Sequence, residues 1–119
     1  MKDYRQLLIW QKGVQIVKMT YGLTKLLPDS ERFNLISQMN RAAVSIPSNI
    51  AEGGSRGSEK DYKRFLEYSL GSCFELETQC LIIKELNLSN HLTIDNLLKC
   101  LEEEIMMLYG FMKKLKISY

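Results

Sequence analysis

Apolar residues recur at steps of three and four along four successive segments of this 119-residue chain, and turn-forming residues separate the segments. This spacing places apolar side chains on one face of a helix. The helices are expected at residues 6–27, 31–51 or slightly beyond, 59–87, and from about 90 or 93 to 117. Since the connections are short, the pattern predicts an all-α, up-down-up-down antiparallel four-helix bundle that forms a single domain over residues 1–119.

The core-facing stripe can be named for each segment. In the first segment it comprises Leu7, Trp10, Val14, Val17 and Tyr21. In the third it comprises Tyr62, Leu66, Ser69, Cys73, Leu76, Cys80 and Ile83. In the fourth it comprises Leu98, Leu101, Ile105, Leu108, Met112 and Leu115. The three consecutive glutamates Glu102, Glu103 and Glu104 are expected to form a solvated face.

Two features suggest contacts beyond an ordinary core. Gly71 lies in the middle of the third helix, where glycine costs about 1 kcal/mol relative to alanine. It indicates either a close approach by a neighbouring element or a tolerated glycine. The fourth helix is apolar nearly all round between residues 105 and 112, which is hard to bury without a second subunit. The residues expected at that subunit interface are Met106, Met107, Tyr109 and Phe111.

The second helix contains Pro47, which removes a backbone donor and clashes with the carbonyl of Ala43. Hydroxyl and amide side chains nearby (Ser45, Ser48 and Asn49) offer alternative hydrogen bonds to the backbone. The face opposite the apolar stripe carries Arg41, Ser45, Ser48, Glu52 and Arg56. Either this is a kinked but ordinary helix, or its outer face packs on a partner. On the second interpretation Ser45, Ser48 and Glu52 belong to an oligomer interface.

Side chains suited to catalysis or metal binding are sparse. Cys73 and Cys80 are roughly 10 Å apart along one helix, which is too far for a disulfide. The single histidine, His91, has no partner at a catalytic spacing and is expected to be exposed or to cap a helix. We therefore predict three free, buried cysteines and no catalytic residue, metal or cofactor.

The net charge is only +2, but residues 1–64 hold eleven basic and six acidic residues, whereas residues 65–119 hold five and eight. Four basic residues (Arg56, Lys60, Lys63 and Arg64) cluster near the start of the third helix. With Arg41 they form a candidate nucleic-acid surface, because Lys and Arg bind phosphates without reading sequence. Alternatively, Arg56 pairs with Glu52 and the lysines are merely solvated. Arg41 and Glu52 could equally be buried across a subunit interface.

Three stretches carry a family resemblance. Residues 41–53 read Arg-Ala-Ala-Val-Ser-Ile-Pro-Ser-Asn-Ile-Ala-Glu-Gly and are followed by Arg56; residues 71–79 read Gly-Ser-Cys-Phe-Glu-Leu-Glu-Thr-Gln; residues 10–12 read Trp-Gln-Lys. The chain thereby resembles bacterial four-helix-bundle proteins related to those encoded in intervening sequences of 23S ribosomal RNA. Accessory proteins of diversity-generating retroelements belong to the same family. Asn40 and Gly57 depart from the pattern at positions that are often basic.

The resemblance implies a homopentamer, and it implies RNA or DNA as a partner, or a protein such as a reverse transcriptase. The motif positions that match are Arg41, Ser45, Pro47, Asn49, Glu52, Gly53, Arg56, Gly71, Ser72, Glu75 and Glu77. No apolar run reaches the 18–20 residues or so of a membrane helix, and the first residues lack a signal-peptide pattern. We therefore expect a cytoplasmic, non-enzymatic, RNA-binding oligomer, or a scaffold that recruits a protein partner without binding nucleic acid.

Overall fold

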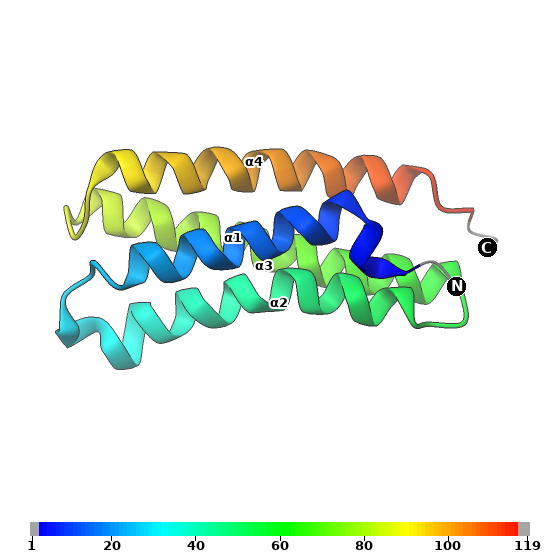
Figure 1. Cartoon of the computed structure of the whole chain (residues 1–119), viewed down its shortest axis with the longest axis horizontal. Helices are drawn as coiled ribbons and strands as arrows, with labels where there is room; N and C mark the ends of the chain where they lie inside the picture. Colours follow the sequence, from blue (N-terminus) through cyan, green and yellow to red (C-terminus); the bar gives the residue numbers. More distant parts are fainter. Residues whose placement is uncertain (1–2, 117–119) are drawn as a thin grey trace.

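The computed structural model describes residues 3–116, which form four long helices (Figure 1). They are α1 (Leu8–Thr24), α2 (Ser37–Gly54), α3 (Glu59–Glu85) and α4 (His91–Lys113). One-turn 3-10 helices lie at Tyr4–Gln6 and Asp29–Glu31, and a π-helical turn at Arg32–Ile36 leads into α2. Because no strand occurs among residues 3–116, the all-α prediction is confirmed.

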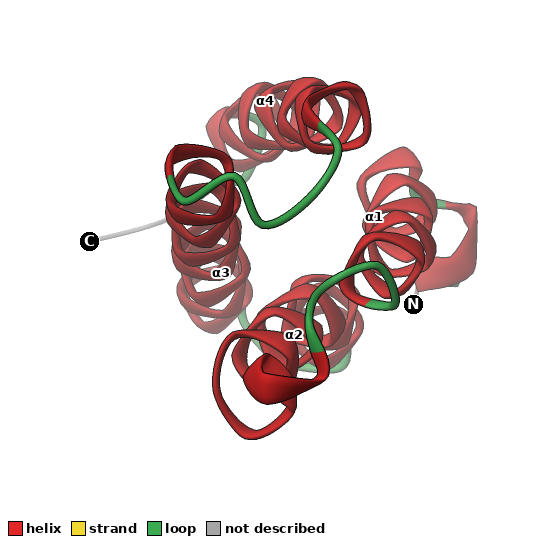
Figure 2. Cartoon of the chain, turned by 90° about the vertical axis from the view of Figure 1, so that its left-hand side faces the viewer, coloured by secondary structure: helices red, strands yellow, loops and turns green. Residues whose placement is uncertain are grey.

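The four helices lie side by side and enclose one core. Seen end-on, helices that are consecutive in the chain are neighbours, and α4 returns to lie next to α1 (Figure 2). Successive helices run in opposite directions, so α1 begins and α4 ends at the same end of the bundle (Figure 1). The predicted up-down-up-down four-helix bundle is therefore confirmed. No helix of the described chain is long and apolar enough to cross a membrane.

Side-chain caps fix where α3 and α4 begin. Ser58 Oγ accepts a hydrogen bond of 3.1 Å from the backbone N–H of Asp61, and Asn90 Oδ1 accepts one of 3.1 Å from that of Thr93. Each bond satisfies one of the free donors in a first helical turn. Asn87, just after α3, has a positive φ of 54°, a conformation that asparagine tolerates better than most residues. Capped by Asn90, the fourth helix begins at the first of the two starting points that the sequence left open.

Pro47 lies inside α2 without ending the helix, because several side chains supply donors around it. Ser45 Oγ donates to the Ala42 carbonyl (2.7 Å) and Asn49 Nδ2 donates to the Ser45 carbonyl (2.8 Å), as predicted. Ser69 of α3 donates to the Ile46 carbonyl at 2.9 Å, a contact that the sequence did not indicate. These bonds tie the proline-containing part of α2 to α3.

The predicted core is correct for most of α3 but wrong for α1. On α3, all of the predicted stripe from Leu66 to Ile83 is buried, and only Tyr62 is half-buried. On α1 the buried residues are Ile9, Gly13, Ile16, Thr20, Leu23 and Thr24. The predicted α1 stripe instead lies at the edge of the core or in solvent. The correct stripe was hidden because Gly13 and Thr20 occupy core positions.

Two further expectations are corrected by the structure. Gly71 faces open space, since a Cβ built there would meet nothing within 4 Å, so it marks no close approach. Of the three consecutive glutamates, Glu102 and Glu103 are exposed as expected, but Glu104 is completely buried. Glu104 follows Leu97 and Leu101 at steps of four and three, so it lies on the core face of α4.

Candidate nucleic-acid interface

The corner between α2 and α3 positions most of the predicted basic cluster. Gly53 lies in the last turn of α2, and a Cβ there would be only 2.9 Å from Cβ of Phe65. The missing side chain therefore allows the end of α2 to pack directly on the start of α3. Residues 55–58 then turn the chain, and α3 begins at Glu59 with its N-cap Ser58. Arg56, Lys60, Lys63 and Arg64 are all displayed around this corner.

The two arginines of the cluster have local partners. Arg56 donates to Glu52 at 2.8 Å, and its guanidinium carbon lies 4.3 Å from the ring centroid of Phe65. Arg64 lies 3.6 Å from Asp61 and 5.5 Å from the same ring centroid. Exposed pairs of this kind stabilise a helix by only about 0.3–0.5 kcal/mol, so both guanidinium groups remain able to exchange partners.

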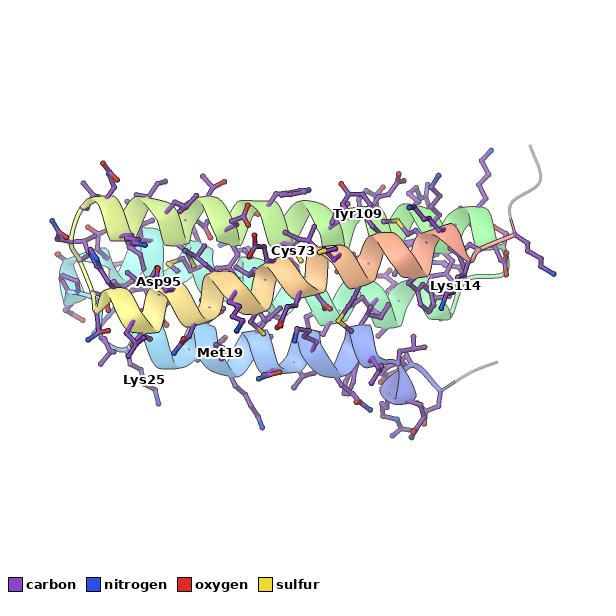
Figure 3. All side chains as sticks on the ribbon, turned by 90° about the horizontal axis from the view of Figure 1, so that it is seen from above. Met19, Lys25, Cys73, Asp95, Tyr109 and Lys114 are labelled. Atoms are coloured by element: carbon purple, nitrogen blue, oxygen red, sulfur yellow. The ribbon has the colours of Figure 1, made fainter. Side chains whose placement is uncertain are left out.

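The lysines are different, because no ion pair among residues 3–116 involves Lys60 or Lys63. Lys63 also lines a groove of about 410 Å³ between α3 and α4, together with Lys113, Glu67 and Tyr109. Lys113 and Lys114 are exposed and likewise form no ion pair with a described residue. Figure 3 shows Lys114 at the same end of the bundle as Tyr109.

The basic surface is thus larger than the sequence cluster and includes the end of α4. We use the term "lysine surface" for Lys60, Lys63 and Lys113. Glu67, which lines the groove, is an acidic residue within it. Lys114 follows α4 directly and lines a different groove, between α4 and the start of α1. The α4 lysines lie near the C-terminus of a helix, where positive charge is favourable. The signal that could have revealed them is the Lys-Lys pair at 113–114 at the expected end of the fourth helix.

Arg41 does not join this surface. It is exposed and lies thirteen residues before Gly54, the last residue of α2, which corresponds to roughly 20 Å along the helix. The structure therefore brings together Arg56, Lys60, Lys63 and Arg64 from the predicted set, but separates Arg41 from them. A ligand that touches both regions must extend along the outside of α2.

The residues predicted for an oligomer interface fall into two groups. Ser48 and Glu52 are exposed on α2, and Met106 and Tyr109 are 74% and 47% exposed on α4. The remaining three make contacts within the chain. Ser45 Oγ lies 2.5 Å from Ser72 Oγ on α3, Met107 packs against the core, and the ring centroid of Phe111 lies 5.6 Å from that of Tyr62.

Groups with catalytic or metal-binding chemistry are scattered. No group of three or more His, Cys, Asp or Glu side chains in the described part of the chain could hold a metal ion. His91 is exposed and lies 3.0 Å from Asn87 Oδ1. Cys73, Cys80 and Cys100 are free and buried, as predicted. Burial raises the pKa of the Cys80 thiol to about 12, which makes it a poor nucleophile at neutral pH.

Known proteins share this fold. A protein of unknown function from the S23 ribosomal protein family of Bacteroides thetaiotaomicron superposes with a TM-score of 0.83. That structure is 19% identical in sequence, and the match covers 90% of this chain and all of the other. At this level of identity the likeness shows the fold alone.

The comparison with curated proteins gave no match. The model of the family described as "23S rRNA-intervening sequence protein" matches residues 5–110, which include α1, α2, α3 and most of α4. Because that match covers nearly the whole described bundle, the chain belongs to the 23S rRNA-intervening sequence protein family.

Proposed function

We propose that this protein is a non-enzymatic, cytoplasmic bacterial homopentamer that binds RNA through the lysine surface and the neighbouring Arg56 and Arg64. The observation that carries the proposal is the gathering of three lysines from α3 and α4 without an ion-pair partner among the described residues. Lysines without an ion-pair partner are free to replace the counterions of a phosphate backbone.

The geometry favours sequence-independent recognition. Lys60 and Lys63 lie on the outside of α3, and Lys113 lies across the groove from Lys63. Lysine is a flexible point charge, so such a set fits a backbone of variable shape better than a fixed base edge. RNA is favoured over a single phosphorylated metabolite because the lysines spread along the grooves and do not converge on one point.

The first test is binding of the purified protein to a structured RNA hairpin at several salt concentrations. If about four of the five basic side chains (the three lysines, Arg56 and Arg64) each neutralise one phosphate, the logarithm of the binding constant should fall with a slope of about 3–4 against the logarithm of salt concentration. A DNA of the same sequence is the second probe, because RNA and DNA carry the same backbone charge. A flat salt response, or no binding at low salt, would contradict the proposal.

The pentamer is proposed from the family resemblance and from side chains that the monomer leaves in solvent. Met106 and Tyr109 of α4 and Ser48 and Glu52 of α2 are the proposed contacts. Light scattering should give a particle of about five times the 13.8 kDa chain mass. Met106→Glu is expected to reduce that mass, because a charge at a subunit contact would be desolvated without a partner. A monomeric wild-type protein would refute this part of the proposal.

The second candidate function is a scaffold that recruits a protein, such as a reverse transcriptase, without binding nucleic acid. It is favoured by large apolar side chains left exposed on and just after α3, namely Phe74, Leu81, Ile82 and the C-cap residue Leu86. Apolar surface of this kind marks protein contacts more often than nucleic-acid contacts. A pull-down from nuclease-treated lysate distinguishes the two functions. Recovery of a protein partner by wild type, but not by Ile82→Lys, supports the scaffold, whereas recovery of nucleic acid alone opposes it.

A further inference from the structure

The core of the bundle contains one acidic side chain with no partner. Glu104 of α4 is 0% exposed, and neither Oε1 nor Oε2 has a hydrogen-bond partner among residues 3–116. Its carboxyl group lies where α1, α2 and α4 meet, because a Cβ built on Gly13 would be 3.3 Å from Glu104 Oε2 and 3.3 Å from Cβ of Pro47. The same Cβ would lie 3.4 Å from Cγ2 of Ile46. Gly13 thus leaves the space that the carboxyl group occupies.

Among the described residues, the positive charge that acts on Glu104 is that of Lys12 on α1. Its Nζ already lies 2.9 Å from Glu103 Oε1, so it compensates an ionised Glu104 only in part. On α3 the titratable group that interacts electrostatically with Glu104 is the Cys73 thiol, which lies near the middle of the bundle (Figure 3). On α4 itself the neighbouring titratable groups are Cys100 and Glu103. The α2 residues at this level, Ile46 and Pro47, carry no titratable group.

A carboxylate buried without donors costs several kcal/mol more than a neutral carboxylic acid in the same place. Desolvation by burial accordingly raises the pKa of Glu104 to about 8, and the attraction of Lys12 offsets only part of that effect. At neutral pH the side chain therefore carries its proton.

We propose that Glu104 makes the packing of α4 against α1 and α2 dependent on a proton: the neutral acid fits into the core, and its ionisation loosens α4 from the bundle. The negative charge can be solvated only if α4 moves outward or water enters between the helices. This device is independent of RNA binding, since Glu104 lines neither of the grooves that carry the lysine surface.

The direction of the pH effect follows from proton binding. The unfolded carboxyl group titrates near its ordinary pKa of 4.5, and the folded one near 8. Between these values the folded state holds one proton more, so stability falls as pH rises. The folding equilibrium constant should drop by up to tenfold per pH unit in this window, and the contribution should level off above pH 8. Below pH 4.5 the Glu104 contribution is again constant.

The test compares urea unfolding of the full chain at one protein concentration from pH 5 to pH 9, for wild type and Glu104→Gln. Glutamine has nearly the same shape but does not titrate. Relative to Glu104→Gln, the wild-type folding constant should fall by several hundred-fold over this range. The matched control is Glu102→Gln, which changes a nearby exposed carboxylate that forms no ion pair with a described residue. This control variant should show the same steep fall of the folding constant with rising pH as the wild type.

A direct measurement covers the case in which Glu104→Gln does not fold. The wild-type protein labelled with ¹³C at glutamate carboxyl carbons should show one side chain that titrates far above the others, near pH 8. Amide hydrogen exchange in α4, corrected for the intrinsic effect of pH, should accelerate over the same range. Parallel stability profiles for wild type and Glu104→Gln, or titration of every glutamate below about pH 5.5, would overturn the inference.

Discussion

Replacing Gly53 by alanine is expected to lower the free energy of unfolding by about 1–3 kcal/mol, the usual effect of adding a methyl group where there is no space. The new Cβ would lie 2.9 Å from Cβ of Phe65 and 3.3 Å from the backbone oxygen of Tyr62. Neither atom can rotate away, because one is the first side-chain atom and the other belongs to the backbone. The end of α2 must therefore move away from α3. Urea unfolding of the wild type and the variant measures the loss of stability, provided that the two proteins have nearly the same m-value.

The matched control is Gly71→Ala on α3. Its Cβ would meet nothing within 4 Å, and the position lies in the interior of the helix. Alanine should therefore raise the free energy of unfolding by about 0.5–1 kcal/mol through helix propensity alone. Equal effects of the two substitutions would mean that Gly53 is not in close contact with α3 in solution.

These glycines also show what the sequence could and could not predict. Periodicity located Gly71 on a helix and placed Gly53 at or just beyond the end of one. It could not distinguish a glycine that faces another helix from one that faces solvent. The family motif includes both positions, so it could not separate them either. That distinction depends on how α2 and α3 approach each other, which is a property of tertiary packing.

The core of α3 was predictable because its buried positions carry leucine, isoleucine, cysteine and serine at regular steps. The core of α1 was not, because Gly13 and Thr20 interrupt the apolar stripe. Glu104 was missed for a similar reason, because a charged residue occupies a core position. Its position at step three from Leu101 indicates the core, but its charge and its two glutamate neighbours indicate solvent. Residue type was given more weight than position, and position proved to be the better guide.

The basic surface was likewise predictable only in part. The cluster at the start of α3 was visible as a local run of charge, and the separation of Arg41 follows from the rise of a helix. The contribution of Lys113 could not be predicted locally, since it requires the end of α4 to lie beside the start of α3. The antiparallel topology does predict that the end of α4 lies beside the start of α3, because in an up-down-up-down bundle the fourth helix ends where the third begins.

The lysine surface allows the strongest test of the proposed function. Changing Lys60, Lys63 and Lys113 together to alanine should weaken RNA binding by about two to three orders of magnitude at 0.1 M salt, if each lysine neutralises one phosphate. The slope of the logarithm of the binding constant against the logarithm of salt concentration should decrease by about 2.7. All three side chains lie in or beside the grooves on α3 and α4, and none forms an ion pair with a described residue. The fold should therefore be unaffected, which thermal unfolding can verify.

The control for that variant removes the same charge elsewhere. Lys18, Lys25 and Lys99 are exposed and lie outside both grooves of the lysine surface. Their triple replacement by alanine changes the net charge equally, so it reproduces any effect of overall charge on association. If the lysine surface is the binding site, the control should weaken binding only slightly and leave the salt slope nearly unchanged. An equal loss in both triples would show that RNA responds to net charge alone, and would contradict a defined site on α3 and α4.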